Sequence, residues 1–204
     1  MDDSAAQARP LQGLASLSLA GQVRMMSDPE KRSFAPFIVT AELPGDVFAW
    51  ADELRRAHFP PERNWLRAHV TLFHAFAPSL RQELRGLLGQ VAGEYAPPLV
   101  RIEGLMDLGK GTAIALRSPA MLAIREHIAD HFHGALTAQD AHPPRLHITI
   151  QNKVTPQAAK ALQRELAEAV PTREFAITGL GLHLYMGPQW EGQGVWPFRG
   201  KQDG

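Results

Sequence analysis

A histidine followed two residues later by a threonine occurs twice in this chain. His69 precedes Thr71 and His147 precedes Thr149, and apolar residues flank each threonine. In an extended strand, alternate side chains point to the same face. Each histidine would then stand beside its threonine, with the apolar neighbours turned into a core. The two copies predict a site where two imidazoles, which can exchange protons, and two hydroxyls, which can bind an anion, face one substrate.

The surroundings of the two histidines also match. Pro78 and Pro156 follow their histidines at the same distance, and so do Leu84 and Leu162. In both copies a strand is followed by a proline-marked turn and then by an amphipathic helix. The chain is therefore predicted to be a duplicated unit whose two halves have diverged in most residues.

Both helices that follow a histidine strand have starting signals. Ser79, with Gln82 three residues later, forms a capping-box pattern in the first. Thr155 precedes Pro156 in the second, as is typical of an N-cap followed by the first helical residue. An apolar stripe at helical spacing marks the buried face of each helix. The stripes are Leu80, Leu84, Leu87, Leu88 and Val91 in the first helix, and Ala159, Leu162, Leu166 and Val170 in the second.

The elements that must position these helices and histidines can be predicted in both halves. Each half should consist of a strand, a helix, the histidine strand, a second helix and a closing strand. Asp46 is expected to cap the earliest of the helices. The expected opening strands are 37–43 and 112–116, the expected helices after them are 46–58 and 120–132, and the closing strands are 100–105 and 175–180.

Composition limits the class of protein. The chain has 204 residues, 45% of them hydrophobic, which fits a single domain with a substantial core. The formal net charge of zero argues against a protein that binds long nucleic acid mainly through its phosphates. Binding of a nucleotide or an RNA end needs only local positive charge. The absence of cysteine excludes disulfides, a thiol nucleophile and a cysteine zinc site.

The same features predict the domain organisation. We expect a poorly ordered leader over residues 1–33, one bilobal domain over residues 34–199 whose lobes exchange strands, and a loose C-terminus over residues 200–204. No apolar run in the sequence is long enough to span a membrane. We therefore expect a cytoplasmic monomer.

The paired His-x-Thr-x phrases in a duplicated strand-helix layout resemble the two-histidine (2H) phosphoesterase superfamily. Within it, the chain is most similar to the bacterial 2′-5′ RNA ligase-like, cyclic phosphodiesterase branch, over residues 34–199. The resemblance implies an α+β fold. Two lobes related by a pseudo-twofold axis would contribute antiparallel strands to a curved, barrel-like sheet, with helices outside and a cleft at the centre.

The resemblance also implies a reaction and a substrate. The implied reaction is the hydrolysis of 2′,3′-cyclic phosphodiesters at RNA ends or on small nucleotides. It gives a 2′-phosphate and uses no metal or cofactor. In-line attack needs a base and an acid on opposite sides of phosphorus, and histidine can serve as either near neutral pH. We assign His147 as base and His69 as acid, although the pseudo-symmetry leaves the reverse open. Thr71 and Thr149 would donate hydrogen bonds to phosphate oxygens.

Three cations are candidates for holding the phosphate. Lys153 shares strand parity with His147 if the strand stays regular that far, and the alternative is a solvated lysine at a strand end. Arg67 and Arg145 also share parity with their histidines. They stand at the strand starts, which favours a place away from the cleft.

Other residues near the motifs have weaker signals. His74 has the opposite parity to His69, so without a bulge it faces away from the cleft and has a structural role. Tyr185 and Trp190 could stack on a base, although such aromatic residues more often anchor a core or a loop.

Other functions remain open at this point. The same site could run in reverse and join RNA ends through a 2′-5′ bond. A non-catalytic module that binds RNA ends or nucleotides could retain the scaffold, although both intact histidine-threonine pairs argue against it. A metal-dependent hydrolase is disfavoured because no carboxylate or cysteine lies near either motif.

Overall fold

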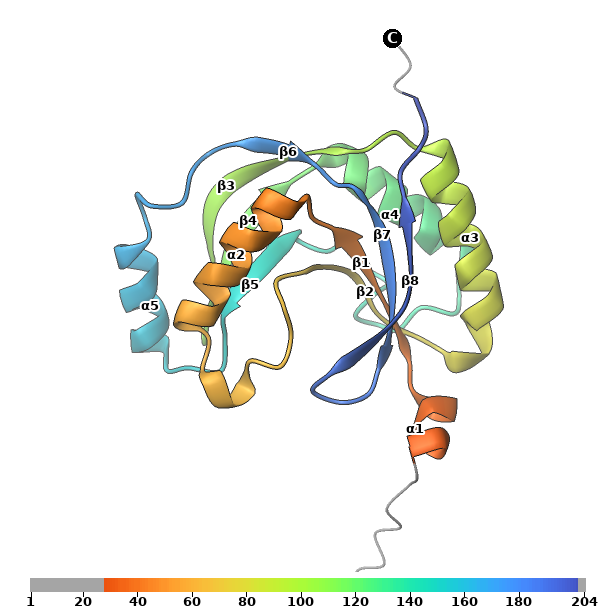
Figure 1. Ribbon diagram of the computed structural model, residues 1–204, viewed down its shortest axis with the longest axis horizontal. Coiled ribbons are helices and arrows are strands. Elements are labelled where there is room, and N and C mark those ends of the chain that lie inside the picture. Colours follow the sequence, from red (N-terminus) through yellow and green to blue (C-terminus); the bar gives the residue numbers. More distant parts are fainter. Residues whose placement is uncertain (1–27, 202–204) are drawn as a thin grey trace, which may run out of the picture.

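The computed structural model describes residues 28–201 (Figure 1). Most of the predicted leader lies outside this range, and its residues 28–33 fall in a short helix, α1 (Asp28–Phe34). At the other end, the backbone N–H of Gly200 donates to the carbonyl of Tyr95 at 3.0 Å, and residues 202–204 lie outside the described range. Within the described residues, no helix has the length and apolar character needed to cross a bilayer.

Two four-stranded antiparallel sheets form the centre of the molecule (Figure 1). This confirms the predicted α+β class. The first sheet has the order β2-β1-β7-β8, formed by β1 (Phe37–Glu42), β2 (Val70–Phe76), β7 (Gly179–Tyr185) and β8 (Trp190–Pro197). The second has the order β5-β4-β3-β6, formed by β3 (Leu99–Asp107), β4 (Thr112–Arg117), β5 (His147–Gln151) and β6 (Glu174–Ala176).

The duplication is visible in the order of the strands. In each sheet the strand that carries the motif threonine, β2 or β5, lies at the edge and pairs with the first strand of its own unit, β1 or β4. The next position is filled from the other unit, because β3 pairs with β4 and β7 pairs with β1. This exchange places the two edge strands, β2 and β5, next to each other.

The helices cover the sheets and join the lobes. They are α2 (Gly45–His58), α3 (Arg81–Glu94), α4 (Pro119–His131) and α5 (Pro156–Glu165), with 3₁₀ turns η1 (Pro61–Arg63) and η2 (Pro78–Leu80). The helices α3 and α5 lie at opposite sides of the molecule (Figure 1), α3 against β7 and β8, and α5 against β3 and β4. Helix α2 instead packs against β5 of the second sheet. Phe132, which follows α4, places its ring 4.9 Å from that of Phe76 in β2. The helix α2 and the end of α4 therefore each pack against the sheet of the other lobe.

Side-chain caps begin the two helices of the second unit. The hydroxyl of Thr155 accepts from the N–H of Ala158 at 3.2 Å, which confirms the predicted cap of α5. Ser118 caps α4 by accepting from the N–H of Met121 at 3.1 Å, and its own hydroxyl donates to the carbonyl of Leu99 in β3 at 2.6 Å. Ser118 thus fixes the start of α4 to the sheet.

The two caps predicted for the first unit are wrong. Ser79 lies inside η2, because the turn already begins at Pro78 and its first backbone bond runs from Leu80 to Ala77. No side-chain cap bond opens α3. Asp46 lies in the first turn of α2 rather than at its cap, which is residue 44, a proline. An acidic side chain at that place still favours the positive end of the helix dipole.

These assignments predict a difference between two serine substitutions. Ser118→Ala should lower the free energy of unfolding by about 1–3 kcal/mol, because it removes the cap and leaves the Leu99 carbonyl without its donor. Ser79→Ala should change it by less than about 0.5 kcal/mol. Denaturant unfolding of the two variants measures both values, and an equal loss in the two would contradict the assignment of caps.

Candidate active site

The structure brings the two motifs together in one cleft. His69 lies directly before β2, and His147 is the first residue of β5. The cleft between these edge strands has a volume of about 450 Å³, and His69, Thr71, His147 and Thr149 all line it. That volume lies in the range of about 300–1,000 Å³ common for small-molecule sites. Two imidazoles and two hydroxyls therefore face a single space, as the alternation of the sequence predicts.

A backbone carbonyl two residues upstream holds each imidazole. The Nδ1 atom of His69 lies 2.7 Å from the carbonyl oxygen of Arg67, and the Nδ1 atom of His147 lies 2.7 Å from that of Arg145. A carbonyl can only accept, so Nδ1 carries the hydrogen in both rings. The lone pair of the neutral ring is then on Nε2, which is left for a substrate. The arginines of the repeat thus act on the histidines through their backbones.

The surroundings of His69 differ from those of its partner. The ring of Trp190 lies 4.7 Å from the ring of His69, tilted by 55°. Burial lowers the pKa of His69 to about 4; the bond to the Arg67 carbonyl opposes this effect, and the nearby charge of Arg55 adds to it. His69 is therefore neutral at neutral pH.

A buried arginine on α2 joins the two halves of the site. The Nε atom of Arg55 donates to the carbonyl of Leu66 at 2.9 Å, and its Nη1 atom donates to the carbonyl of Thr149 at 2.8 Å. Burial lowers the pKa of Arg55 to about 10, with Asp52 opposing the shift, so the guanidinium stays charged at neutral pH. Sequence reasoning missed it, although its spacing of four from Ala51 on a buried helix face is a usable signal.

The Asp52 carboxylate, on the same face of α2 as Arg55, holds the backbone segment that leads to His69. Asp52 is buried and accepts from the backbone N–H of Ala68 at 2.9 Å and from Nε of Arg67 at 2.7 Å. The Arg67 side chain is thereby held away from the cleft, in agreement with its predicted place. Its guanidinium also lies 4.9 Å from the ring of Phe48.

His74 lines the cleft, contrary to the prediction that it faces away. The pairing of β2 with β1 is irregular on both sides of Phe73, which breaks the alternation of the strand. The Asp140 carboxylate stabilises this irregular segment by accepting from the N–H groups of His74 and Ala75 and from Nδ1 of His74, at 2.9–3.0 Å. Burial alone would raise the pKa of Asp140, but these hydrogen bonds outweigh burial and lower it.

Two arginines line the cleft, and the strand on which the prediction for Lys153 depends ends before that residue. Strand β5 ends at Gln151, and Lys153 has a left-handed backbone (φ 59°), so the regular strand assumed for it does not extend that far. The residues lining the cleft include the exposed Arg145 and the buried Arg125 of α4, whose guanidinium lies 4.4 Å from the ring of Phe73. Burial lowers the pKa of Arg125. Among the described residues, no three histidine or acidic side chains are grouped to hold a metal ion.

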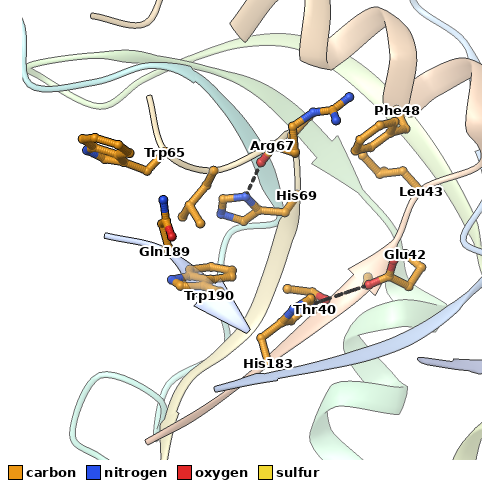
Figure 2. Close-up of a pocket in the computed structure, with 13 residues that line it drawn as sticks. Thr40, Glu42, Leu43, Phe48, Trp65, Arg67, His69, His183, Gln189 and Trp190 are labelled. Atoms are coloured by element: carbon orange, nitrogen blue, oxygen red, sulfur yellow. Dashed lines mark hydrogen bonds and ion pairs between the residues drawn. The ribbon is translucent and has the colours of Figure 1, made fainter. Parts of the chain in front are cut away.

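A second pocket opens on the other side of His69 (Figure 2). It has a volume of about 410 Å³, and His69 and Trp190 line both this pocket and the cleft between β2 and β5. Of the two aromatic residues considered for base stacking, Trp190 therefore lies at the site. Tyr185, at the end of β7, is exposed and lines neither pocket.

Comparisons with known proteins show the family of the chain and the fold that it shares with solved structures. The family model of the 2′-5′ RNA ligase superfamily matches residues 43–188. Among solved structures, TT0787 of Thermus thermophilus has a TM-score of 0.56 at 16% identity, covering 82% of this chain and 100% of that one. E. coli LigT, in its complex with NADP+, has a TM-score of 0.52 at 16% identity over 81% of this chain and 98% of its own. No curated protein matches the sequence.

The position of Trp190 over His69 predicts an unusual titration. The ring protons of His69 should titrate with a midpoint near pH 4, and Trp190→Ala should raise that midpoint toward 6.5 by admitting water. Histidine ring signals in a two-dimensional NMR titration, assigned with His69→Gln, measure both midpoints. A midpoint near 6.5 in the wild type would contradict the effect assigned to burial.

Proposed function

Since the chain belongs to the 2′-5′ RNA ligase superfamily of 2H phosphoesterases, we propose that it is a metal-independent cyclic phosphodiesterase. Family membership makes it a phosphoesterase-type enzyme. Its proposed substrates are 2′,3′-cyclic phosphates at RNA ends or on nucleotides, and its product is the 2′-phosphate. One observation carries the proposal: two imidazoles, each fixed through Nδ1 by a carbonyl, share one cleft with two threonines.

The proposed mechanism uses the two rings on opposite sides of phosphorus. His69 accepts a proton from water through Nε2 as the water oxygen attacks phosphorus. The bond from phosphorus to the ribose 3′ oxygen breaks, and His147 donates a proton to that oxygen. This reverses the roles assigned from sequence. A group with a pKa of about 4 is unprotonated at neutral pH, so His69 is a poor resting acid and an available base.

Charge on the phosphoryl group is stabilised by the remaining cleft residues. The hydroxyls of Thr71 and Thr149 lie on the cleft face and can donate to the non-bridging oxygens. Arg145 and Arg125 add positive charge in the same cleft. Removing one preorganised donor of this kind typically lowers kcat by about 10²–10³-fold.

Replacing either histidine tests the proposal. His69→Ala and His147→Ala should each lower turnover of 2′,3′-cyclic AMP by about 10²–10⁴-fold, because each removes one proton-transfer group. His131→Ala is the matched control, since His131 lies on the surface and pairs with Glu83 at 2.9 Å. EDTA should leave wild-type turnover unchanged. Full activity in either site variant would overturn the two-histidine mechanism, and loss of activity in EDTA would overturn its metal independence.

The pH profile tests which histidine is the base. The value of kcat/KM reports groups in the free enzyme, so its acid limb should fall near pH 4, where His69 gains its proton. The pKa of His69 in the folded protein lies below its unfolded value of about 6.5, so between about pH 4 and about pH 6.5 the unfolded chain binds more protons. The free energy of unfolding should therefore rise with pH over this range. Initial rates and unfolding midpoints over a pH range from about 3.5 to about 8 measure both effects. An acid limb well above pH 4 would contradict the assignment of His69 as base.

A further inference from the structure

His74 lines the cleft between β2 and β5, and the proposed mechanism leaves it without a role. Its Nδ1 atom lies 2.9 Å from the Asp140 carboxylate, which can only accept, so Nδ1 carries the hydrogen. The His74 side chain is 45% exposed, and the hydrogen bonds that its ring makes to the described residues all reach Nδ1. The Nε2 atom is therefore available to a ligand in the cleft.

The carboxylate that holds this ring has its own oxygens fully used. Asp140 is 2% exposed, and of the described residues that line the cleft it alone is acidic. Oδ1 accepts from the backbone N–H and from Nδ1 of His74, and Oδ2 accepts from the N–H of Ala75 and the hydroxyl of Thr137. Asp140 thus orients His74 and offsets positive charge on its ring, but it does not itself meet a ligand.

A buried arginine adds positive charge beside this pair. Arg125 is 4% exposed, lines the cleft and donates from Nη2 to the backbone carbonyl of Asp140. Its Nε atom is buried and has no hydrogen-bond partner among the described residues, which is costly for a charged group. Arg145 brings a second, exposed guanidinium to the same cleft. Two guanidinium groups against one carboxylate leave a surplus of positive charge, which suits a substrate with a further anionic group.

The duplication does not repeat this arrangement. The residue that follows His147 at the distance of His74 from His69 is Asn152. It lies beyond the end of β5, and its side-chain oxygen accepts from the N–H of Lys153 at 2.7 Å. The repeated histidines and threonines can meet a phosphate from two sides, whereas an unrepeated group suits a part of the substrate that lies on one side of phosphorus. The nucleoside is such a part.

The position of His74 suits the far end of that nucleoside. His74 follows Thr71 by three residues in β2, which at about 3.3 Å per residue corresponds to about 10 Å along the strand. A ribose with phosphate groups on both sides, together with the hydrogen bonds at its two ends, spans a distance of this order. The segment that begins at Asp140 continues to Arg145 and His147, so the same stretch of backbone links the ring of His74 to the proposed acid.

We propose that His74, Arg125, Asp140 and Arg145 form a second phosphate site, the His74 subsite, for the phosphate on the 5′ oxygen of the nucleoside that carries the cyclic phosphate. The inference rests on the proposed function and narrows its substrate class. The protonated ring of His74 donates to this phosphate through Nε2, and the guanidinium groups stabilise its charge. Nucleotides and RNA ends that have a 5′ phosphate are preferred over nucleoside cyclic phosphates that lack one.

Three substrates with the same reacting group test the subsite. They are adenosine 2′,3′-cyclic phosphate, the same compound with a 5′ monophosphate, and the dinucleotide CpA with a 2′,3′-cyclic phosphate, in which the 5′ phosphate is a diester. In the wild type, kcat/KM for the two 5′-phosphorylated substrates should exceed that for the first about tenfold or more, which is typical of a hydrogen bond to a charged group.

Two variants identify the group that binds the 5′ phosphate. His74→Phe keeps a ring of similar size without charge or polar atoms, and it should remove most of the preference. His133→Phe is the matched control and should keep the preference, because His133 is exposed and does not line the cleft. A preference that His74→Phe retains overturns the subsite.

The other outcomes separate this inference from the function beneath it. Equal kcat/KM for the three substrates in the wild type overturns the His74 subsite and leaves the phosphodiesterase standing. A preference for the dinucleotide alone also overturns it, because the added base and not the phosphate is then bound. A preference for the 5′ monophosphate, with or without one for the dinucleotide, supports it. Absence of turnover with every substrate overturns the proposed function.

Binding tests the subsite without turnover. Isothermal titration calorimetry compares adenosine 2′,5′-bisphosphate, the product expected from the 5′-phosphorylated nucleotide, with adenosine 2′-monophosphate. The bisphosphate should bind the wild type about tenfold more tightly, and His74→Phe should remove most of the difference. Equal affinities of the wild type for the two compounds overturn the subsite, and this comparison needs no variant.

Discussion

The geometry of the site depends on one buried guanidinium. Arg55 reaches from α2 of the first unit to a carbonyl just before His69 and to the carbonyl of Thr149 in the second unit. Taking a charge out of water is costly unless hydrogen bonds replace the lost hydration, and here backbone and side-chain acceptors do so. The two histidine segments come from different lobes, so no local interaction could set their separation. The exchange of strands brings the two edges together, and Arg55 fixes the spacing between them.

Sequence reasoning succeeded where the signal was local and repeated. The histidine-threonine pairs share one cleft, and Thr155 caps α5, because strand alternation and capping depend on neighbours in the chain. It failed where a distant residue overrides the local pattern. His74 turns to the cleft because Asp140, far along the chain, accepts from its backbone and ring. Lys153 leaves the strand because the backbone turns into a left-handed conformation there.

The pseudo-symmetry is kept in the backbone and lost in the side chains. Both imidazoles make the same bond to a carbonyl two residues back, so both have the same tautomer. The ring of His69 also lies against that of Trp190, and burial lowers the pKa of His69 to about 4. Duplication thus supplies two equivalently held imidazoles in one cleft, and the ring of Trp190 lies against that of His69. The proposed mechanism requires one ring to be neutral while the other is protonated.

The same tryptophan also lines the pocket on the other side of His69. Trp190 forms a wall of the pocket that holds Glu42 and His183, and its ring lies 5.7 Å from the ring of His183. Exclusion of water by the Trp190 ring lowers the local dielectric, which strengthens the burial that keeps His69 neutral.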